Sequence, residues 1–516
     1  MQEQRTAVID LGSNSFRLVV FTATAGWWKR TDEIYEPVRI GEGMGETGAL
    51  GEEPMTRAFA TIDVFTHFCE ATGIAPRDVT AVATSAIREA SNGAAFVERA
   101  RDVAGLDVRV IGREEEARYG YLAAVNSTTL SDGLVLDLGG GSLQLVDVED
   151  RRARALESWR LGAVRMTERF LADGEPAGRR ELDRLRDHVA GKLARVPWVA
   201  EGAAAGAGAG EVGGRRLVGI GGTIRNLATA AARAAGLPNI GIQGYVVEPA
   251  ALDELVDRLA ALPARERGGI SGIKSARADI VLAGAVTVQT ILRETGAAGL
   301  EATEAGLREG VFFAQHFDGD PPLSPDVRAA SVQNLASQFR VDPAHTNHVA
   351  RLALGLFDDL AAAGLHPGDR VERDLLWAAC VLHDIGVAVD YDDHHKHTRY
   401  LILNAGLPGY SPAEVALIAQ ATRYHRKGMP DPGDLGALFD DEARARLNRC
   451  AVLLRLGEDL ERSRDQLVRG VDVAVSGDDV TLTLDTTDDH RVSRWAARRE
   501  VELFARAFGG ARLTIA

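Results

Sequence analysis

Two short turns contain the residue types best suited to chemistry. In each, an apolar strand pattern ends near an aspartate, Asp10 or Asp137, and a run of small glycine- and serine-rich residues follows. Small residues allow several backbone N–H groups to converge on the oxygens of one phosphate. Two opposed aspartates suit Mg²⁺, bound directly or through water. The pair of turns therefore predicts a site for a phosphate group and a divalent cation.

A third glycine turn has the same small-residue character. The segment Gly219-Ile220-Gly221-Gly222-Thr223 follows the strand pattern RRLV and opens a helix pattern. The free N–H groups at a helix N-terminus favour anions. This turn is a further candidate for binding phosphate.

The turns must be positioned by strands and helices that alternate along the first part of the chain. Strands are expected at 6–11, 16–23, 80–85 and 107–111, and helices at 54–72, 91–104 and 114–125. At 133–148 the order of strand, Gly/Ser turn and strand starts again. Such a repeat indicates a duplicated lobe, so we place two α/β lobes at 1–125 and 126–315.

The remaining chain has a different character. Pro, Gly and Asp residues in 316–326 mark a domain boundary, and helix patterns follow. We expect an all-α domain at 326–468. A small α+β segment at 471–516, with a hairpin, a helix and a strand, is expected to pack against it. The Gly/Ala-rich stretch 201–214 is predicted to be a flexible insertion in the second lobe.

Composition argues against several classes of protein. The 516 residues are too many for one core, and no apolar run is long enough to span a bilayer. The first residues lack the features of a signal peptide, which predicts a cytoplasmic location. A formal net charge of −15 argues against nucleic acid as a partner. The three scattered cysteines predict neither a disulfide framework nor a cysteine zinc site.

Seven motifs occur here in the order and spacing of a known family: VIDLGSNSF, TSAIREASN, VIGREEEARYGYLAA, LVLDLGGGS, LGAVRMTE, GIGGTIRNLA and GLREGVFF. The chain resembles the exopolyphosphatase / guanosine pentaphosphate phosphatase family over residues 6–315, and more loosely to the end. The resemblance implies the α/β fold of the sugar kinase, Hsp70 and actin superfamily, with two actin-like (ribonuclease H-like) lobes. It also implies hydrolysis of a terminal phosphate, with water rather than a sugar as the acceptor.

The resemblance implies roles for individual residues. Glu116 matches the base that orients and deprotonates water, with Glu114 and Glu115 as register alternatives. Acidic residues at a helix start are also favoured electrostatically. Arg88 matches an arginine that binds the transferred phosphoryl group. Asp10 and Asp137 match the two aspartates that hold Mg²⁺ or Mn²⁺ in the cleft. The matching or neighbouring phosphate-binding positions are Ser13, Asn14, Gly139, Gly140, Gly141, Ser142, Gly221, Gly222 and Thr223.

One position departs from the family pattern. After the GGGS turn the family usually carries a Thr-Glu pair, whose carboxylate is thought to help with the metal. This chain has Leu143-Gln144 instead. A neutral amide at this position is expected to alter the metal geometry or the rate.

The helical half carries histidines and acidic residues spread over successive helix patterns. Their order resembles the histidine-aspartate metal-phosphohydrolase superfamily, in which imidazoles and carboxylates from separate helices hold one or two divalent metals. The implied ligands of this second metal site are His348, His383, Asp384, His397, His425, Glu458 and Asp459. The last position falls on Glu458, since Asp459 points about 100° away around a helix. Two other interpretations are a basic path for polyphosphate along Lys396, Arg399, Arg423, Arg426 and Lys427, and a purely structural scaffold.

We predict an exopolyphosphatase that removes terminal phosphate from inorganic polyphosphate, with Glu116 activating water between the lobes. The nearest alternative is hydrolysis of guanosine pentaphosphate, which would connect the protein to the stringent response. A regulator that binds polyphosphate or a guanosine alarmone without turnover is a third interpretation. A sugar or acetate kinase is disfavoured, because EEEAR and Arg88 resemble the phosphatase branch. No membrane partner is expected, and a homodimer is left open.

Overall fold

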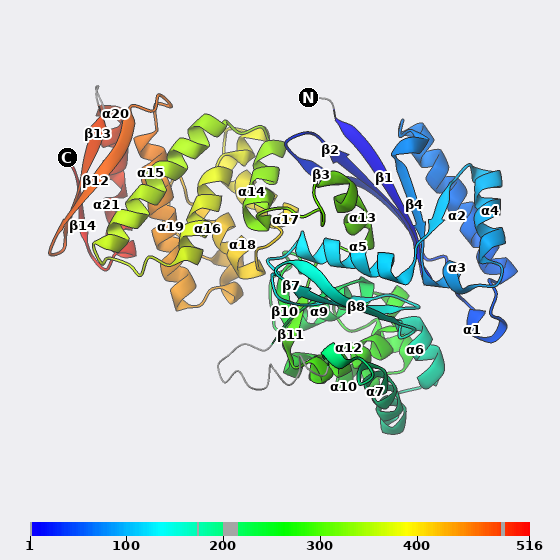
Figure 1. Cartoon of the computed structure of the whole chain (residues 1–516). Coiled ribbons are helices and arrows are strands. Elements are labelled where there is room, and N and C mark those ends of the chain that lie inside the picture. Colours follow the sequence, from blue (N-terminus) through cyan, green and yellow to red (C-terminus); the bar gives the residue numbers. More distant parts are fainter. Residues whose placement is uncertain (1–2, 173–174, 200–214, 487–490) are drawn as a thin grey trace. The chain divides into compact units, whose positions relative to one another are not determined.

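The computed structural model describes residues 3–172, 175–199, 215–486 and 491–516. It divides into two compact units (Figure 1). Unit 1 comprises Met1–Gly236 and Ile242–Val327, and unit 2 comprises Leu237–Gly241 and Arg328–Ala516. The division falls directly after the segment 316–326 from which a boundary was predicted. The predicted insertion 201–214 lies outside the described residues.

The first sheet of unit 1 has the strand order β3-β2-β1-β4-β5. Its strands are β1 (Gln4–Leu11), β2 (Phe16–Ala23), β3 (Trp28–Glu36), β4 (Val79–Ala83) and β5 (Val108–Val110). The first three strands pair antiparallel, and β4 and β5 add parallel to β1. Both faces of β1 are apolar because both are covered: Ala7 and Ile9 pack on one side and Val8 on the other.

The second sheet repeats this plan with the order β10-β11-β9-β6-β7-β8. Its strands are β6 (Gly133–Leu138), β7 (Leu143–Glu149), β8 (Arg152–Trp159), β9 (Arg215–Ile220), β10 (Tyr245–Val247) and β11 (Ala297–Ala302). Strands β6, β7 and β8 pair antiparallel, and β9 and β11 add parallel to β6. The predicted fold of two related α/β lobes is therefore confirmed.

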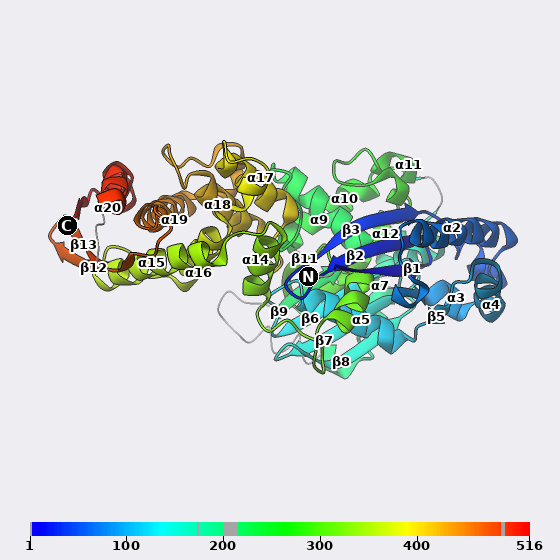
Figure 2. The ribbon, with the colours of Figure 1, turned by 90° about the horizontal axis from the view of Figure 1, so that it is seen from above.

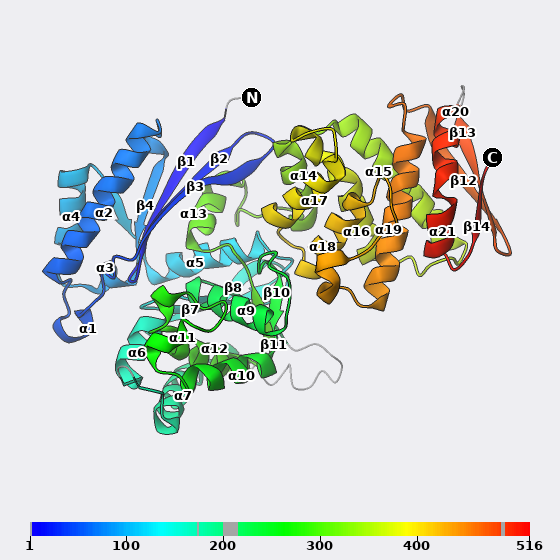
Figure 3. The same cartoon turned by 180° about the vertical axis from the view of Figure 1, so that it is seen from behind.

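The outer faces of the two sheets are covered by separate helices (Figures 1 and 3). Helices α2 (Glu52–Ala71) and α4 (Gly93–Ala104) bury their apolar sides with the first sheet. The second sheet buries one face with α7 (Arg179–Leu193), α9 (Gly222–Ala234), α10 (Pro249–Ala260) and α12 (Val281–Thr295). Helix α12 is apolar almost all round, as expected of a helix buried between others.

Two helices lie between the sheets and cross over from one lobe to the other. Helix α5 (Arg113–Val125) follows the first sheet in the chain, yet its apolar side packs on the second sheet. Helix α13 (Leu307–His316) follows the second sheet, yet packs on the first. The two helices touch closely, since a Cβ at Gly310 would lie 1.9 Å from the carbonyl oxygen of Tyr119. Packing thus crosses the boundary at 125/126 that the chain order predicted.

Unit 2 is helical except for one small sheet (Figures 2 and 3). Its core is formed by α14 (Val327–Gln338), α15 (Pro343–Ala362), α16 (Arg370–Leu382), α17 (His394–Ala405), α18 (Pro412–Arg423) and α19 (Asp441–Leu460). The sheet has the order β12-β13-β14, with β12 (Val468–Ser476), β13 (Asp479–Thr486) and β14 (Arg512–Ile515). With α20 (Arg491–Ala497) and α21 (Val501–Ala507), it shares the helical core. Among the described residues, no helix is both long and apolar enough to cross a membrane.

Candidate active site

A pocket of about 120 Å³ lies in unit 1 where the turns of the two sheets meet. Its lining combines polar side chains with glycines, and Leu138 and Leu307 are its apolar side chains among the described residues. The lining comprises Asp10, Gly12, Ser13, Asn14, Ser15, Arg17, Thr84, Ser85, Glu116, Asp137, Leu138, Gly139, Gly140, Ser142, Gly221, Gly222, Arg225, Arg277, Gly306, Leu307 and Arg308. The pocket therefore brings together turns that lie far apart in the sequence.

Three carboxylates form one pole of this pocket. Asp10 and Asp137 occupy the same position in their lobes, one residue before the ends of β1 and β6, and Glu116 lies in the first turn of α5. Burial raises the pKa of all three groups. For Asp137, burial and then the charges of Glu116 and Asp10 raise the pKa to about 7. Crowded, buried carboxylates of this kind favour a nearby cation.

Glu116 is held by two hydrogen-bond donors. Arg88 Nη1 donates to Glu116 Oε2 at 2.8 Å and to the carbonyl of Ile111 at 3.0 Å. Ser142 Oγ donates to Glu116 Oε1 at 3.2 Å. Glu114 is exposed and Glu115 pairs with Arg109, so Glu116 is the member of the EEE run that faces the pocket.

Gln144 belongs to the same network, although it does not line the pocket. Its side chain is buried, and Nε2 donates to Ser142 Oγ at 3.0 Å and to Ser158 Oγ at 3.4 Å. Gln144 therefore fixes the direction in which Ser142 donates, toward Glu116. Gln144, at the position where the family usually has Glu, thus contacts Ser142 and does not lie among the pocket carboxylates.

Four arginines form a basic pole beside these carboxylates, and the sequence analysis did not identify them. They are Arg17, Arg225, Arg277 and Arg308, all of which line the pocket. Burial, together with the charges of Arg308 and Arg17, lowers the pKa of Arg225 to about 10. Arg308 Nη1 lies 3.2 Å from Asp10 Oδ2 and joins the two poles. Within a chain of net charge −15, this pocket is a local concentration of positive charge suited to an anion.

Arg17 and Arg225 could have been found from the sequence. Arg17 is the cross-strand partner of Asp10 in the β1–β2 hairpin, a register that a short turn at 12–15 predicts. Arg225 lies in the first turn of the helix that the third glycine turn opens. Arg277 ends the short 3-10 helix Ser275–Arg277, and no motif in the sequence pointed to it. It packs against the start of α9, where a Cβ at Gly222 would lie 2.2 Å from Arg277 Nη2.

The predicted phosphate-binding positions divide into two groups. Ser13, Asn14, Gly139, Gly140, Ser142, Gly221 and Gly222 line the pocket, whereas Gly141 and Thr223 do not. The N–H of Gly139 donates to the carbonyl of Ser142 at 3.0 Å and closes the turn. Arg88 is not part of the lining and reaches the site through Glu116. Within the described residues, its Nε and Nη2 atoms are buried and have no hydrogen-bond partner.

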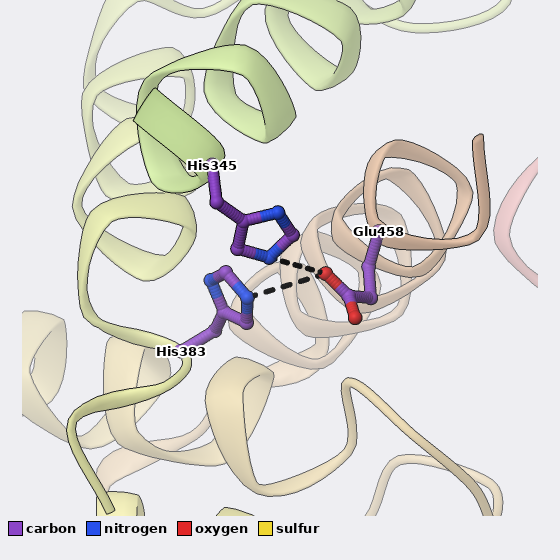
Figure 4. A group of neighbouring side chains, drawn as sticks. All are labelled: His345, His383 and Glu458. Carbon is purple, nitrogen blue, oxygen red and sulfur yellow. Dashed lines mark ion pairs between the residues drawn. The ribbon is translucent and has the colours of Figure 1, made fainter. Parts of the chain in front are cut away.

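A second cluster of functional side chains lies inside unit 2. One group comprises His345, His383 and Glu458 (Figure 4), and another comprises Asp384, His394 and His425. Glu458 Oε2 lies 3.0 Å from His345 Nε2 and 3.4 Å from His383 Nε2. His383 Nε2 also lies 3.7 Å from Asp384 Oδ1, which connects the two groups.

Three of the predicted metal ligands lie outside this cluster. His348 Nε2 contacts the carbonyl of Val468 at 2.9 Å, and His397 and Asp459 belong to neither group. His345 and His394, each three residues earlier on the same helix, lie in the two groups instead, and Glu458, which was among the predicted ligands, lies in the first. The structure therefore does not bring His348, His397 and Asp459 into either group, and the ligand set stays a prediction. Spacing alone does not tell which of two histidines three residues apart on a helix faces the interior.

The cations of the predicted basic path are engaged within unit 2. Lys396 Nζ pairs with Asp393 at 2.6 Å, and Arg399 pairs with Asp434. Arg423 lies over the ring of Tyr424. A path along these residues stays a prediction.

Comparison with known proteins identifies the family. A model of the Ppx/GppA phosphatase family matches residues 19–316, and a model of Ppx/GppA phosphatase domain III matches residues 327–500. The second match covers most of unit 2. The resemblance of that unit to histidine-aspartate phosphohydrolases stays a prediction.

Solved structures resemble part of the chain. A Ppx/GppA family member from Aquifex aeolicus is 28% identical, and the match covers 61% of this chain and 98% of that chain with a TM-score of 0.52. A further structure, of the Aquifex aeolicus PPX-GPPA enzyme, is 29% identical over 60% of this chain and 99% of that chain, with a TM-score of 0.50.

An exopolyphosphatase from Cytophaga hutchinsonii shares the fold, at 24% identity over 60% of this chain and 97% of that chain with a TM-score of 0.54. The first family model alone spans more than half of the chain, so the predicted family is confirmed. The chain belongs to the Ppx/GppA phosphatase family and is a phosphoanhydride hydrolase.

Proposed function

We propose that the protein is an exopolyphosphatase, which removes the terminal phosphate from inorganic polyphosphate in the unit 1 pocket. The observation that carries this proposal is the composition of the pocket. It places four arginines and several small turn residues around about 120 Å³, and none of the described residues in the lining is aromatic. Guanidinium groups and backbone amides bind phosphate oxygens. A guanine base would find no stacking surface in this lining, so a linear phosphate chain is favoured over guanosine pentaphosphate.

Glu116 is the proposed general base. A water molecule within hydrogen-bond reach of its carboxylate would lose a proton to Glu116 as the water oxygen bonds to the terminal phosphorus. The anhydride P–O bond then breaks, and the shortened chain leaves with the bonding electrons as an anion. The two donors on Glu116 keep its oxygens in a fixed direction, and Arg88, which lies outside the lining, is proposed to act through this contact.

Enzymes of this family depend on divalent metals in general, and the carboxylate pole fits such an ion. Oxygen ligands suit Mg²⁺, and a cation would offset both the burial and the neighbouring charges that raise the pKa of Asp137 to about 7. Asp10 and Asp137 are the residues that would hold it. When bound, Mg²⁺ or Mn²⁺ would neutralise charge on the phosphate oxygens.

The test is phosphate release by the full-length protein from long-chain polyphosphate and, separately, from guanosine pentaphosphate. The variants are Glu116→Gln and, as a matched control from the same helix turn, Glu114→Gln. We expect wild type and Glu114→Gln to degrade polyphosphate, and Glu116→Gln to lose about 10²- to 10⁴-fold in kcat, the usual contribution of a general base.

Other outcomes would select among the alternatives. Higher kcat/KM on guanosine pentaphosphate would replace polyphosphate as the substrate. Binding of polyphosphate without phosphate release would favour a regulator. Full activity of Glu116→Gln would remove Glu116 from the mechanism.

A further inference from the structure

We propose that unit 2 holds two divalent metal ions and hydrolyses a phosphate ester of nucleotide size, separately from the polyphosphate site of unit 1. The proposed ligands are His345, His383 and Glu458 for one ion and Asp384, His394 and His425 for the other. The inference goes beyond the proposed function and does not depend on it, since the residues involved all lie in unit 2.

The ligand atoms converge on two centres. Within each group they lie within 4.8 Å of one another, a spacing that one cation can bridge. His345 and His383 are almost fully buried, at 2% and 0% exposure. His345 Nε2 and His383 Nε2 both face Glu458 Oε2, at 3.0 and 3.4 Å, as ion pairs (Figure 4), and among the described residues these buried atoms make no hydrogen bond. A cation between the three atoms would coordinate both rings and the carboxylate at once, in place of ion pairs that require protonated rings.

The histidine rings are held in the form that binds metal through Nε2. His383, His394 and His425 place Nδ1 at 2.7, 2.9 and 2.7 Å from the carbonyls of Cys380, Tyr391 and Thr422. A carbonyl accepts only from Nδ1–H, so in each neutral ring the lone pair is on Nε2. The Nε2 atoms of His394 and His425 then lie 3.1 Å apart with lone pairs facing each other. A shared cation satisfies both.

A cavity of about 640 Å³ opens onto the second group. Asp384, His394, His425 and Glu458 lie in its wall, so bound ions would face a ligand in the cavity. This volume is in the usual range of small-molecule sites, about 300–1,000 Å³.

Four arginines of the cavity wall point to a phosphate group: Arg340, Arg426, Arg462 and Arg464. Arg464 Nη2 lies 2.7 Å from Asp384 Oδ2, and Arg462 Nη1 lies 3.8 Å from Glu458 Oε1. Both guanidinium groups therefore reach the positions next to the proposed ions. The backbones of Arg340 and Arg464 adopt left-handed conformations, with φ of 51° and 55°. Such conformations are uncommon for residues other than glycine and are found at functional sites.

The wall also carries a surface for an organic group. Phe339, Val341, Val387 and Tyr391 contribute apolar and aromatic area, and Arg426 lies over the Tyr391 ring at 5.4 Å. A cavity wall that has arginines beside the metal ligands and also carries aromatic rings matches a nucleotide. It matches inorganic polyphosphate less well, because polyphosphate has no apolar part. In the proposed reaction, the oxygen of a water molecule bonds to phosphorus, and the P–O bond to the organic group breaks. The leaving oxygen takes up a proton, so that ester and water give an alcohol and phosphate.

The first experiment measures metal without reference to activity. Full-length wild type, His383→Gln, Asp384→Asn and the control His348→Gln are loaded with Mn²⁺ and gel-filtered. Retained manganese is counted by mass spectrometry, and paired ions are detected by their coupled electron paramagnetic resonance spectrum. His348 is a suitable control because it lies one helical turn from His345 and outside the cluster.

We expect wild type and His348→Gln to retain two more Mn²⁺ ions per chain than His383→Gln, and the coupled spectrum to vanish in His383→Gln and Asp384→Asn. Circular dichroism checks that each variant is folded. If His383→Gln does not fold, Asp384→Asn, which preserves side-chain shape, is the variant that tests metal binding. Equal manganese content in wild type and Asp384→Asn overturns the metal assignment and leaves a proton-sharing histidine network.

The second experiment tests the reaction in the Glu116→Gln background, which removes the proposed unit 1 chemistry. The probes are p-nitrophenyl phosphate, bis(p-nitrophenyl) phosphate and the four ribonucleoside 5′-monophosphates with Mn²⁺. We expect hydrolysis of at least one probe, a loss of roughly 100-fold or more on adding Asp384→Asn, and a higher KM without loss of manganese in Arg464→Gln. Bound manganese with no probe hydrolysed, or hydrolysis unaffected by Asp384→Asn, overturns the hydrolytic assignment.

Discussion

The unit 1 pocket and the unit 2 cluster use different chemistry to meet the same kind of group. In unit 1, arginines and turn amides surround the phosphate position, and a few carboxylates occupy one side. In unit 2, imidazoles and carboxylates gather inside a helical core, and arginines stand only at the cavity wall. The comparison teaches that turns at strand ends offer backbone donors to an anion, whereas the interior of a helix uses its backbone donors in its own hydrogen bonds and offers only side chains. A helical site for phosphate is therefore expected to rely on metal ions.

The largest effects are expected from two substitutions, one in each site, which test whether the sites act separately. Asp137→Asn should reduce polyphosphate hydrolysis by roughly 10³-fold or more, because a charge-neutralising ion loses a ligand, while the manganese of unit 2 stays bound. Asp384→Asn should release the manganese of unit 2 and leave polyphosphate hydrolysis in place. Phosphate release and metal content are measured on both proteins. If Asp384→Asn also abolishes polyphosphate hydrolysis, the two sites act as one and the comparison fails.

A smaller effect is expected from the arginine pole. Arg308→Gln removes the guanidinium that lies 3.2 Å from Asp10 and lines the pocket. We expect kcat/KM for polyphosphate to fall about 10²- to 10³-fold and its dependence on NaCl concentration to become shallower, since one fewer positive charge attracts the substrate. Arg186→Gln, in the same unit but paired with Asp183 and Gln289 outside the pocket, is the control. An unchanged salt dependence would argue against Arg308 as a phosphate ligand.

Arg88→Gln tests the link between the arginine and the base. The Arg88 charge opposes the rise that burial causes in the pKa of Glu116, so removing it raises that pKa further. Because the base works only when deprotonated, activity should be lost at a higher pH than in the wild type. We expect kcat/KM to fall about 10- to 100-fold at neutral pH and the acidic limb of its pH profile to move upward. An acidic limb that stays in place would mean that another group titrates there.

The smallest effect is expected at Gln144, a positioning residue. Gln144→Leu removes the donor that holds Ser142 in line with Glu116. Loss of one hydrogen bond of about 1 kcal/mol corresponds to about a fivefold fall in kcat, with KM unchanged because no phosphate contact is lost. Ser158→Ala, which removes the longer 3.4 Å partner of Gln144, should have a weaker effect. A change in KM rather than kcat would give Gln144 a substrate contact instead.

The sequence was most informative where local chain geometry decides the outcome. Asp10, Asp137 and the small residues that follow them lie within two hairpins, and a hairpin turn fixes its own neighbours. Glu116 was placed by the resemblance, which left Glu114 and Glu115 as register alternatives, and of the three Glu116 lines the pocket. Arg277 could not be found this way, because only tertiary packing brings the short 3-10 helix Ser275–Arg277 to the start of α9.

The helical half was harder for a related reason. His345 and His348 lie on one helix three residues apart, as do His394 and His397, so both members of each pair lie on nearly the same face. Which member reaches the ligand centre depends on how neighbouring helices are placed along their axes, and hydrophobic periodicity carries no information on that displacement. Glu458 and Asp459 differ by about 100° around their helix, and the preference for Glu458 came from the resemblance to the histidine-aspartate superfamily, whose aspartate position falls on it.

The crossing of α5 and α13 has a mechanical consequence for catalysis. Glu116 lies on α5, which packs on the second sheet. Arg88 lies on α3 (Ser85–Glu89), whose buried residues belong to the core of the first sheet. The 2.8 Å ion pair between them therefore spans two mechanical bodies. Any rotation of one sheet against the other would pull the base from its arginine and turn both away from a common phosphorus atom. The ion pair would therefore be complete only when the two lobes hold the orientation that brings both residues together.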